Sequence, residues 1–173
     1  MMRKIEAPRL TLEPQLAQHA GAMFAVLSDP AIYAHENAPP ASVEWLYQRF
    51  AALEARRSPD GRELWLNWVL RQRSGELIGY VQATVGVEGR AFIAYEMASA
   101  HWGRGLASEA VEAMIDELAS RYGVHTLVAV FKRANTRSRR LLERLSFTPA
   151  AAAAADPDED MMERKLAPAE TTR

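Results

Sequence analysis

Three strand-like runs follow one another between residues 64 and 97, and the short turns between them restrict the possible fold more than any other feature. The first run alternates large side chains over Leu64–Leu70, the second covers Leu77–Val87 and the third covers Ala91–Met97. Ser74-Gly75 and Glu88-Gly89 are typical turn dipeptides, and turns this short join antiparallel strands. The segment therefore predicts an antiparallel three-stranded sheet.

The hydrophobic period then changes from that of a strand to that of a helix. The apolar residues that recur at helical spacing are Val111, Met114, Ile115, Leu118 and Tyr122. The run Thr126–Phe131 predicts a buried strand after that helix. A strand, a crossover helix and a second strand form a right-handed parallel unit. We therefore predict an α/β chain of the α+β type, with a mixed, mostly antiparallel central sheet and helices on both faces.

Further elements flank this core on both sides. The predicted elements are a strand over Arg9–Glu13, a helix opened by Pro14, a helix capped by Ser42, a helix starting near Asn135 and a last strand over Met161–Leu166. The six alanines Ala150–Ala155 are interpreted as a weak strand edge that runs into a solvated acidic loop over Asp156–Asp160. We expect a single domain over residues 9–166, with residues 1–8 and 167–173 as flexible termini.

Charge and composition exclude several classes of function. The chain carries 21 basic and 22 acidic residues, so it lacks the basic excess that a dedicated nucleic-acid binder usually shows. It has no cysteine, and its four histidines lack metal-ligand spacing, so we expect no metal site. No apolar run approaches the roughly 20 residues of a membrane helix, and no apolar segment typical of a secretory signal follows the first residues. We therefore expect a cytoplasmic protein without membrane contact.

A glycine-containing loop between a predicted strand and a predicted helix carries the strongest chemical signal. It reads His101-Trp102-Gly103-Arg104-Gly105-Leu106-Ala107-Ser108-Glu109-Ala110. Glycines let the backbone turn sharply, and a helix N-terminus offers unpaired N–H donors and partial positive charge, so the loop suits a phosphate or pyrophosphate. By spacing alone, a tight turn without any ligand remains an equal interpretation.

Two other phosphate motifs do not fit this loop. The chain has no G-x-x-x-x-G-K-[ST] segment and hence no P-loop. Counted from Gly103, the sixth position of a G-x-G-x-x-G motif is Ser108 rather than glycine. The crossover also comes late, after antiparallel hairpins, which argues against a dinucleotide-binding Rossmann site.

The loop resembles motif A of the GNAT acetyltransferases, Q/R-x-x-G-x-G/A, which reads here Trp102-Gly103-Arg104-Gly105-Leu106-Ala107. Its first position departs from the family, because Trp102 stands where Gln or Arg is usual. A second segment, Asn135 to Phe147, resembles the N-x-x-S…L-x-x-L/F-G-F element of the branch that includes the ribosomal-protein N-terminal acetyltransferases. Ser146 replaces the glycine there, which puts the left-handed turn at that position in question. The order of elements fits this family from about Leu10 to Leu166.

The resemblance implies the GNAT fold and an acetyl-CoA site where two parallel strands, Ala91–Met97 and Thr126–Phe131, splay apart. It implies that backbone N–H groups of the loop hold the pyrophosphate, that Ser108 adds a hydroxyl and that the backbone near Met97 pairs with the pantetheine arm. The cofactor-binding residues expected on this basis are Met97, Ala98, Trp102, Gly103, Arg104, Gly105, Leu106, Ala107, Ser108 and Asn135. Arg104 is equally interpretable as a solvated loop residue. The arginines clustered around Arg140 are assigned to the 3′-phosphate end of CoA or to water.

The resemblance further implies direct transfer of acetyl from acetyl-CoA to a primary amine, on a small molecule or a protein N-terminus, without a metal. Such transfer needs a base for the amine proton and a hydrogen bond or acid near the thioester. Glu96 is the candidate base, with an ion-paired strand-end carboxylate as the alternative. Ser138 is the candidate acid, although it is also a first-turn helix residue that Asn135 would cap.

The acceptor itself is not identified by the sequence. In this family the segment between the first two helices usually shapes the acceptor pocket, and here it spans Ile32–Pro40, within which Glu36 is a candidate to attract a cationic amine. A surface loop is the alternative interpretation of the segment. The resemblance also allows a homodimer. A different class of function is an acyl-CoA-binding sensor or scaffold with this fold and no turnover.

Overall fold

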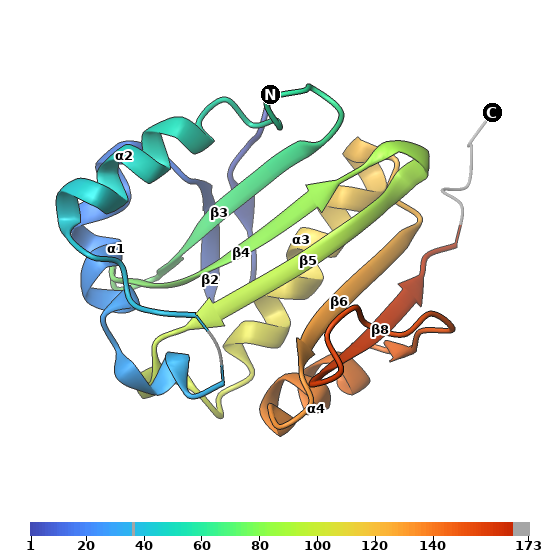
Figure 1. The fold of residues 1–173 in the computed structure, drawn as a ribbon. Helices are drawn as coiled ribbons and strands as arrows, with labels where there is room; N and C mark the ends of the chain where they lie inside the picture. The colour runs from blue at the N-terminus through green and yellow to red at the C-terminus, as the bar shows by residue number, and fades with distance from the viewer. Residues whose placement is uncertain (36, 168–173) are drawn as a thin grey trace.

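The computed structural model describes residues 1–35 and 37–167, and within them eight strands form one sheet (Figure 1). The strands are β1 (Ile5–Glu6), β2 (Leu10–Pro14), β3 (Leu64–Gln72), β4 (Leu77–Val85), β5 (Arg90–Met97), β6 (Thr126–Lys132), β7 (Thr148–Pro149) and β8 (Glu159–Lys165). The α-helices are α1 (Ala20–Leu27), α2 (Val43–Leu53), α3 (Leu106–Tyr122) and α4 (Thr136–Arg144).

The sheet order is β1-β2-β3-β4-β5-β6-β8-β7, and among the strands of the described residues only β5 and β6 pair in parallel. Their pairing is short, because it joins Arg90–Phe92 to Thr126–Val128 and stops there. Both strands continue beyond this point, β5 to Met97 and β6 to Lys132. The mixed sheet and the splayed parallel pair predicted from the sequence are therefore confirmed.

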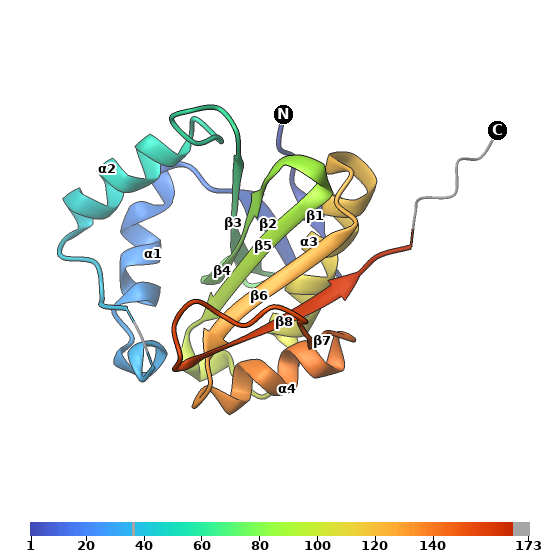
Figure 2. The same cartoon turned by 45° about the vertical axis from the view of Figure 1, so that its right-hand side comes forward.

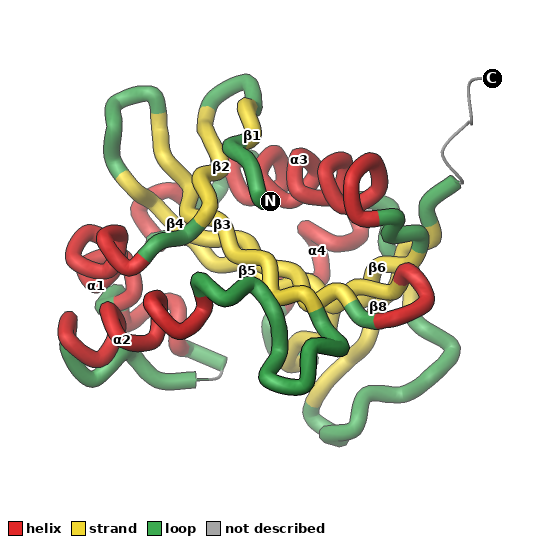
Figure 3. The backbone as a smooth tube through the Cα atoms, turned by 90° about the horizontal axis from the view of Figure 1, so that it is seen from above, coloured by secondary structure: helices red, strands yellow, loops and turns green. Residues whose placement is uncertain are grey.

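Helices cover both faces of the sheet, as Figure 2 and the view from above in Figure 3 show. The helix α3 packs on one face through Val111, Met114 and Leu118, and Leu142 of α4 joins the same core. The helices α1 and α2 cover the opposite face over β3 and β4. Alternation along the strands produces these two cores, because successive side chains point to opposite faces. None of the helices in residues 1–35 and 37–167 is long and apolar enough to cross a membrane.

The N-terminal segment differs from the expectation of a flexible terminus over residues 1–8. Residues 5 and 6 form β1 and pair with β2. Arg3 also makes a salt bridge of 2.7 Å with Glu117, a buried carboxylate of α3. Partner groups that lie over 100 residues away thus order this segment, and local sequence does not show such partners.

The first helix begins later than predicted. Pro14 does not open it, because Pro14 is the last residue of β2 and pairs with Trp68 of β3. A short 3-10 turn over Ala17–His19 follows, and α1 begins at Ala20. Proline is tolerated at the end of a strand where no ladder hydrogen bond needs its missing N–H.

The alanine run and the acidic residues after it are also placed differently. Ala150–Ala155 lies in no strand, since only Thr148–Pro149 pairs with β8 in this region. Alanine has no branched side chain to pack against a neighbouring strand, so it has low strand propensity. Asp160 is not in a solvated loop but in β8, where it contacts the guanidinium groups of Arg133 and Arg139. The last six residues, 168–173, lie outside the described residues, as does Glu36.

The turn after α4 keeps the conformation that a glycine would favour. Ser146 has a φ of 65°, in the left-handed region, so the replacement of glycine has not changed the turn. The Phe147 N–H donates to the carbonyl of Leu142 at 2.9 Å and closes the end of the helix. The conformation costs roughly 1 kcal/mol for a residue with a Cβ, and this hydrogen bond and the burial of Phe147 offset it.

Candidate functional site

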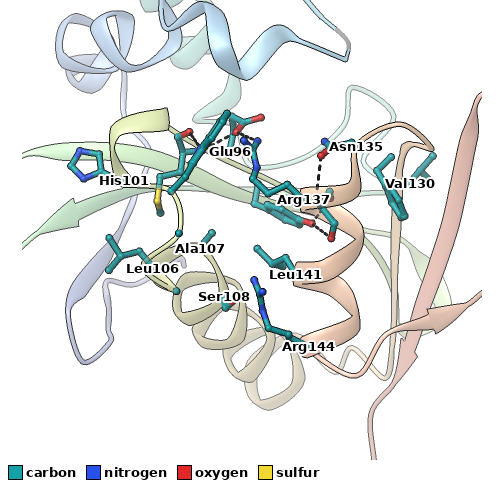
Figure 4. A pocket seen from close by; sticks show the side chains of 17 residues that line it. Glu96, His101, Leu106, Ala107, Ser108, Val130, Asn135, Arg137, Leu141 and Arg144 are labelled. Carbon is teal, nitrogen blue, oxygen red and sulfur yellow. Dashed lines mark hydrogen bonds and ion pairs between the residues drawn. The ribbon is translucent and has the colours of Figure 1, made fainter.

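A cleft of about 310 Å³ opens where β5 and β6 separate (Figure 4). The end of β5, the loop before α3, the strand β6 and the first turns of α4 line it. Among the expected site residues, the cleft is lined by Glu96, Met97, Trp102, Gly103, Gly105, Leu106, Ala107, Ser108, Asn135 and Ser138. The structure thus brings ten of the twelve expected site residues to one cleft, and Ala98 and Arg104 lie beside it.

The N-terminus of α3 supplies donors to this cleft. Gly105 is the residue before the helix and has a φ of 74°, a left-handed conformation that glycine adopts at no steric cost. No side chain caps the first turn of the helix, so its leading N–H groups keep no intrahelical or capping partner. The end of a 17-residue helix therefore directs unpaired donors and partial positive charge into the cleft.

Ser108 adds an unsatisfied polar atom at the same place. Its hydroxyl oxygen is buried and has no hydrogen-bond partner in the described structure. Buried hydroxyls are nearly always bonded, so an orphaned one in a cleft indicates a missing ligand or water. A pyrophosphate at the helix N-terminus would accept from this hydroxyl and from the free N–H groups. The residues present therefore fit the group that the family resemblance implies.

A residue from the first hairpin holds the loop before α3 in place. Arg9 donates from Nη1 to the carbonyl of Arg104 at 2.7 Å and from Nε to Glu109 at 3.0 Å. The guanidinium of Arg104 does not extend into the cleft, since its Nη2 lies 2.6 Å from Nδ1 of His101. His101 also contacts the amide of Gln72 at 2.8 Å. These contacts favour a structural role for the Arg104 side chain.

The backbone at the end of β5 is already engaged. The Ala98 N–H donates to the carbonyl of Ile78 at 2.9 Å, which extends the pairing with β4. The Met97 carbonyl accepts from Nε1 of Trp102 at 2.8 Å, and the Met97 N–H donates to Glu96 at 3.1 Å. A pantetheine arm that pairs with Met97 would therefore replace the Trp102 indole at this carbonyl.

Trp102 and Arg137 form a contact across the cleft that sequence reasoning did not predict. The guanidinium carbon of Arg137 lies 3.2 Å from the centroid of the Trp102 ring, a stacked cation–π arrangement. Burial in this contact lowers the pKa of Arg137 below its ordinary value. The motif position that usually carries Gln or Arg thus carries a ring, and an arginine from α4 lies on that ring. The two residues are 35 positions apart in the chain, so no local sequence pattern reveals this pair.

Glu96 lies at the end of β5, and its side chain is 22% exposed. Its carboxylate is 3.5 Å from Nη2 of Arg137, so the ion pair weighed as an alternative does form. Across the sheet Glu96 is paired with Tyr80 of β4. The carboxylate lines the cleft, and the charge of Glu96 contributes to a raised pKa of Tyr33, after burial as the larger cause.

The hydroxyl of Ser138 faces the hydroxyl of Tyr95 at 2.5 Å. Burial raises the pKa of Tyr95 to about 12, so the phenol stays protonated at neutral pH and can donate to Ser138. Asn135 caps α4 as predicted, because its Oδ1 accepts from the Ser138 N–H at 3.1 Å. The cap uses the amide oxygen of Asn135, so its amide N–H₂ is left to donate toward the cleft that the residue lines.

Close approach of β4 fixes the position of Glu96. A Cβ on Gly79 would lie 2.3 Å from the Glu96 carbonyl oxygen and 2.9 Å from the Met97 Cα. Only glycine allows the two strands to come this close at the point where β5 ends. The sequence shows Gly79 within a strand, but no local pattern indicates which backbone it meets.

Comparisons with known proteins identify relatives of the whole chain. The family model described as "Acetyltransferase (GNAT) domain" matches residues 9–148. The protein named "Uncharacterized N-acetyltransferase YoaA" of Bacillus subtilis is 32% identical over 152 residues, which cover 83% of this chain and 81% of that protein. Its counterpart p20 of Bacillus licheniformis is 28% identical, covering 84% and 83%.

Solved structures share the fold along nearly the whole chain. A putative GNAT-family acetyltransferase from Bordetella pertussis is 27% identical with a TM-score of 0.74, and the match covers 94% of this chain and 99% of that one. The ribosomal L7/L12 α-N-protein acetyltransferase RimL, solved in complex with CoA, is 18% identical with a TM-score of 0.79 and coverage of 94% and 98%. At that identity the likeness concerns the fold alone.

Proposed function

This chain belongs to the GNAT acetyltransferase family and transfers acetyl from acetyl-CoA to an amine, and we propose that the cleft between β5 and β6 is where it does so. The observation that supports this location most is the buried, unpartnered hydroxyl of Ser108 beside the uncapped N-terminus of α3. Two independent groups there offer hydrogen bonds that one anionic ligand would satisfy together.

In this proposal the chain's own groups bind and orient the acetyl donor. The N–H groups from Gly105 to Ser108 and the Ser108 hydroxyl hold the pyrophosphate, and the amide N–H₂ of Asn135 donates toward the pantetheine arm. Arg144 lines the same cleft and is the candidate for the 3′-phosphate. Acetyl-CoA supplies the thioester whose C–S bond breaks during transfer.

Glu96 is proposed as the base. A neutral amine is needed to form the new N–C bond, and a carboxylate beside the cleft can take the proton that the amine loses. Contact with Arg137 at 3.5 Å orients the carboxylate toward the gap between the strands. The proton moves to Glu96 directly or through one water.

Ser138 is proposed to donate to the sulfur as the C–S bond breaks. The protonated phenol of Tyr95, 2.5 Å away, donates to the Ser138 oxygen and leaves the Ser138 proton free for the sulfur. Its pKa of about 12 keeps Tyr95 protonated during this relay. Tyr95 thus acts as a positioning residue for Ser138.

The acceptor is proposed to be a primary amine of a small molecule or a protein N-terminus. Steady-state transfer to a panel of amines, with mass-spectrometric detection of the product, tests this acceptor class. A panel in which no primary amine is acetylated would contradict it.

The residue roles are tested with Glu96→Gln and Ser138→Ala, using Ser120→Ala at the far end of α3 as a control. We expect kcat to fall about 100-fold in each of the first two variants, because a lost proton-transfer group costs that much, with little change in the KM for acetyl-CoA. Wild-type kcat in both variants would show that the roles are assigned to the wrong residues, although the enzyme would remain an acetyltransferase.

A further inference from the structure

A second cleft lies on the opposite face of the sheet, between α2 and the surface of β3 and β4, where Figure 2 shows α1 and α2 standing over the strands. Residues 37–41 line one side of it, and Trp45 and Phe50 of α2 form an apolar wall. No carboxylate is among the residues that line it in the described part of the chain. The polar groups that the described lining residues offer are therefore amides, the phenols of Tyr33 and Tyr80, and a guanidinium.

Two amide side chains in this cleft are buried without partners. Gln15 is 4% exposed and Asn67 is 7% exposed, and neither side chain makes a hydrogen bond within residues 1–35 and 37–167. The fully buried side-chain atoms that lack a partner in the described part of the chain are Arg56 Nη1 and Ser108 Oγ, so the amide atoms of Gln15 and Asn67 keep some exposure. Both residues line the cleft, so a bound molecule can reach these amides. Together they offer donors and acceptors to a polar, uncharged part of a ligand.

The strand β4 connects the amides of this cleft with Glu96, the proposed base. Asn67 is the cross-strand partner of Gln82, which lines the same cleft. Two residues along β4 from Gln82 is Tyr80, the cross-strand partner of Glu96. Two residues of a strand span about 7 Å, so a ligand bonded to these amides can place an amine at Glu96 if it is roughly the length of a dipeptide.

A cation also lines this cleft. Arg49 of α2 lines it, is exposed and makes no hydrogen bond or ion pair within the described chain. A guanidinium presents a fork of N–H donors that matches a carboxylate. Glu96 lines the first cleft, but its cross-strand partner Tyr80 lines this one, so an amine held here can be directed to that carboxylate while Arg49 offers a guanidinium.

We propose that the acceptor is a small zwitterionic amine, whose carboxylate binds Arg49 and whose polar middle binds Gln15, Asn67 and Gln82. This inference rests on the proposed function, because it takes Glu96 as the place where the amine reacts. In the transfer, the amine nitrogen bonds to the acetyl carbon and the C–S bond breaks with its electron pair going to the sulfur. Glu96 takes the amine proton and returns it to water, while the Ser138 hydroxyl donates a hydrogen bond to the leaving thiolate, which takes its proton from water.

The test compares two acceptors that differ only in the charge at the far end, the dipeptide Ala-Ala and its carboxamide, at equal concentrations of neutral amine. We expect wild-type kcat/KM to be about 3- to 5-fold higher for the free carboxylate, since an exposed ion pair is worth up to about that factor. Arg49→Gln removes this preference by lowering kcat/KM for Ala-Ala alone. Arg62→Gln, an exposed arginine outside the cleft, retains the preference.

A second variant separates ligand contact from structural support. Asn67→Leu replaces an unpartnered amide by an apolar side chain of similar size, so the melting temperature stays equal or rises. The KM for Ala-Ala rises about 5-fold, as expected for one lost hydrogen bond. We expect calorimetric titration of Ala-Ala into the CoA-loaded protein to show, without turnover, weaker binding in Asn67→Leu than in the wild type.

The possible results separate the two claims. Equal kcat/KM for Ala-Ala and its carboxamide, or a preference that survives Arg49→Gln, overturns the inference while the acetyltransferase function stands. A lack of transfer to every amine tested, with Ala-Ala still bound in an Arg49-dependent way, overturns the proposed function but not the ligand chemistry of the cleft.

Discussion

The buried, unpartnered hydroxyl of Ser108 lowers the stability of the ligand-free protein, and we expect it to bind the ligand. Because this oxygen is buried without a partner, Ser108→Ala removes an unsatisfied group and introduces a better helix former. We expect the free energy of unfolding to rise by about 1 kcal/mol and the affinity for acetyl-CoA to fall about 5- to 10-fold. Thermal unfolding and calorimetric titration measure the two effects.

The control for Ser108 is Ser120→Ala, on the same helix. Its hydroxyl donates to the Asp116 carbonyl at 2.7 Å and lies far from the cleft. It should leave acetyl-CoA affinity unchanged. Equal affinity in Ser108→Ala and the wild type would mean that this hydroxyl does not contact the ligand.

His19 makes the fold sensitive to mild acid. Burial lowers its pKa below the ordinary value of 6.5, and its Nδ1 accepts from the Leu16 N–H at 2.9 Å, which only the neutral ring can do. As pH falls below about 6.5, the unfolded chain takes up a proton that the folded chain resists, so stability is lost in that window. Above it, both states are neutral and His19 has no effect on the pH dependence.

Denaturant unfolding of His19→Gln between pH 5 and pH 7.5 tests this assignment, because glutamine can accept the same hydrogen bond without titrating. We expect a flatter pH profile for this variant and the wild-type profile for His35→Gln, an exposed histidine. An unchanged slope in His19→Gln would show that another group causes the acid sensitivity.

At the scale of elements, the contact of β4 with β5 sets the position of the proposed base. Gly79→Ala would bring a Cβ within 2.3 Å of the Glu96 carbonyl oxygen, so the end of β5 must move. We expect a loss of about 1–3 kcal/mol in stability, as for other overpacked sites, together with a lower kcat. In Gly86→Ala the nearest atom would be 3.7 Å away, so this variant serves as the control. Full kcat in Gly79→Ala would contradict the dependence on this contact.

Elements with a strong period could be predicted from sequence. The stripe from Val111 to Tyr122 and the turn dipeptides around β4 each have a local physical cause, and the structure has these elements. The start of α1 could not be predicted, because Pro14 pairs with Trp68 at a distance of over 50 positions. The strand β1 could not be predicted either, because it depends on pairing with β2 and on the nearby salt bridge between Arg3 and Glu117.

The cofactor side of the site was predictable because motif A is continuous in sequence and a helix N-terminus has a known chemistry. The Trp102–Arg137 stack and the Tyr95–Ser138 pair were not, since each joins segments that meet only after the sheet forms. The buried amides of the second cleft, Gln15 and Asn67, gave no sequence signal, because polar residues in strands usually face water.

At the scale of the whole molecule, the sheet carries two clefts, and one cross-strand pair near the end of β5 has a residue in each. One contains the N-terminus of α3 and fits acetyl-CoA, and the other contains amides and Arg49. Glu96 lines the first cleft, and its partner Tyr80 lines the second. In our proposal, acetyl donor and amine thus approach the same carboxylate from two different clefts.

Isothermal titration of acetyl-CoA into the wild-type protein, Gly105→Glu and Gly61→Glu tests the location of the donor site most directly. The two glycines have nearly equal φ values, 74° and 73°, so both substitutions carry the same backbone strain, but only Gly105 lies at the start of α3. We predict one site per chain in the wild type and in Gly61→Glu, and affinity about 100-fold lower in Gly105→Glu, because its carboxylate would face the pyrophosphate. Equal affinity in all three proteins, or no binding to the wild type, would contradict the account.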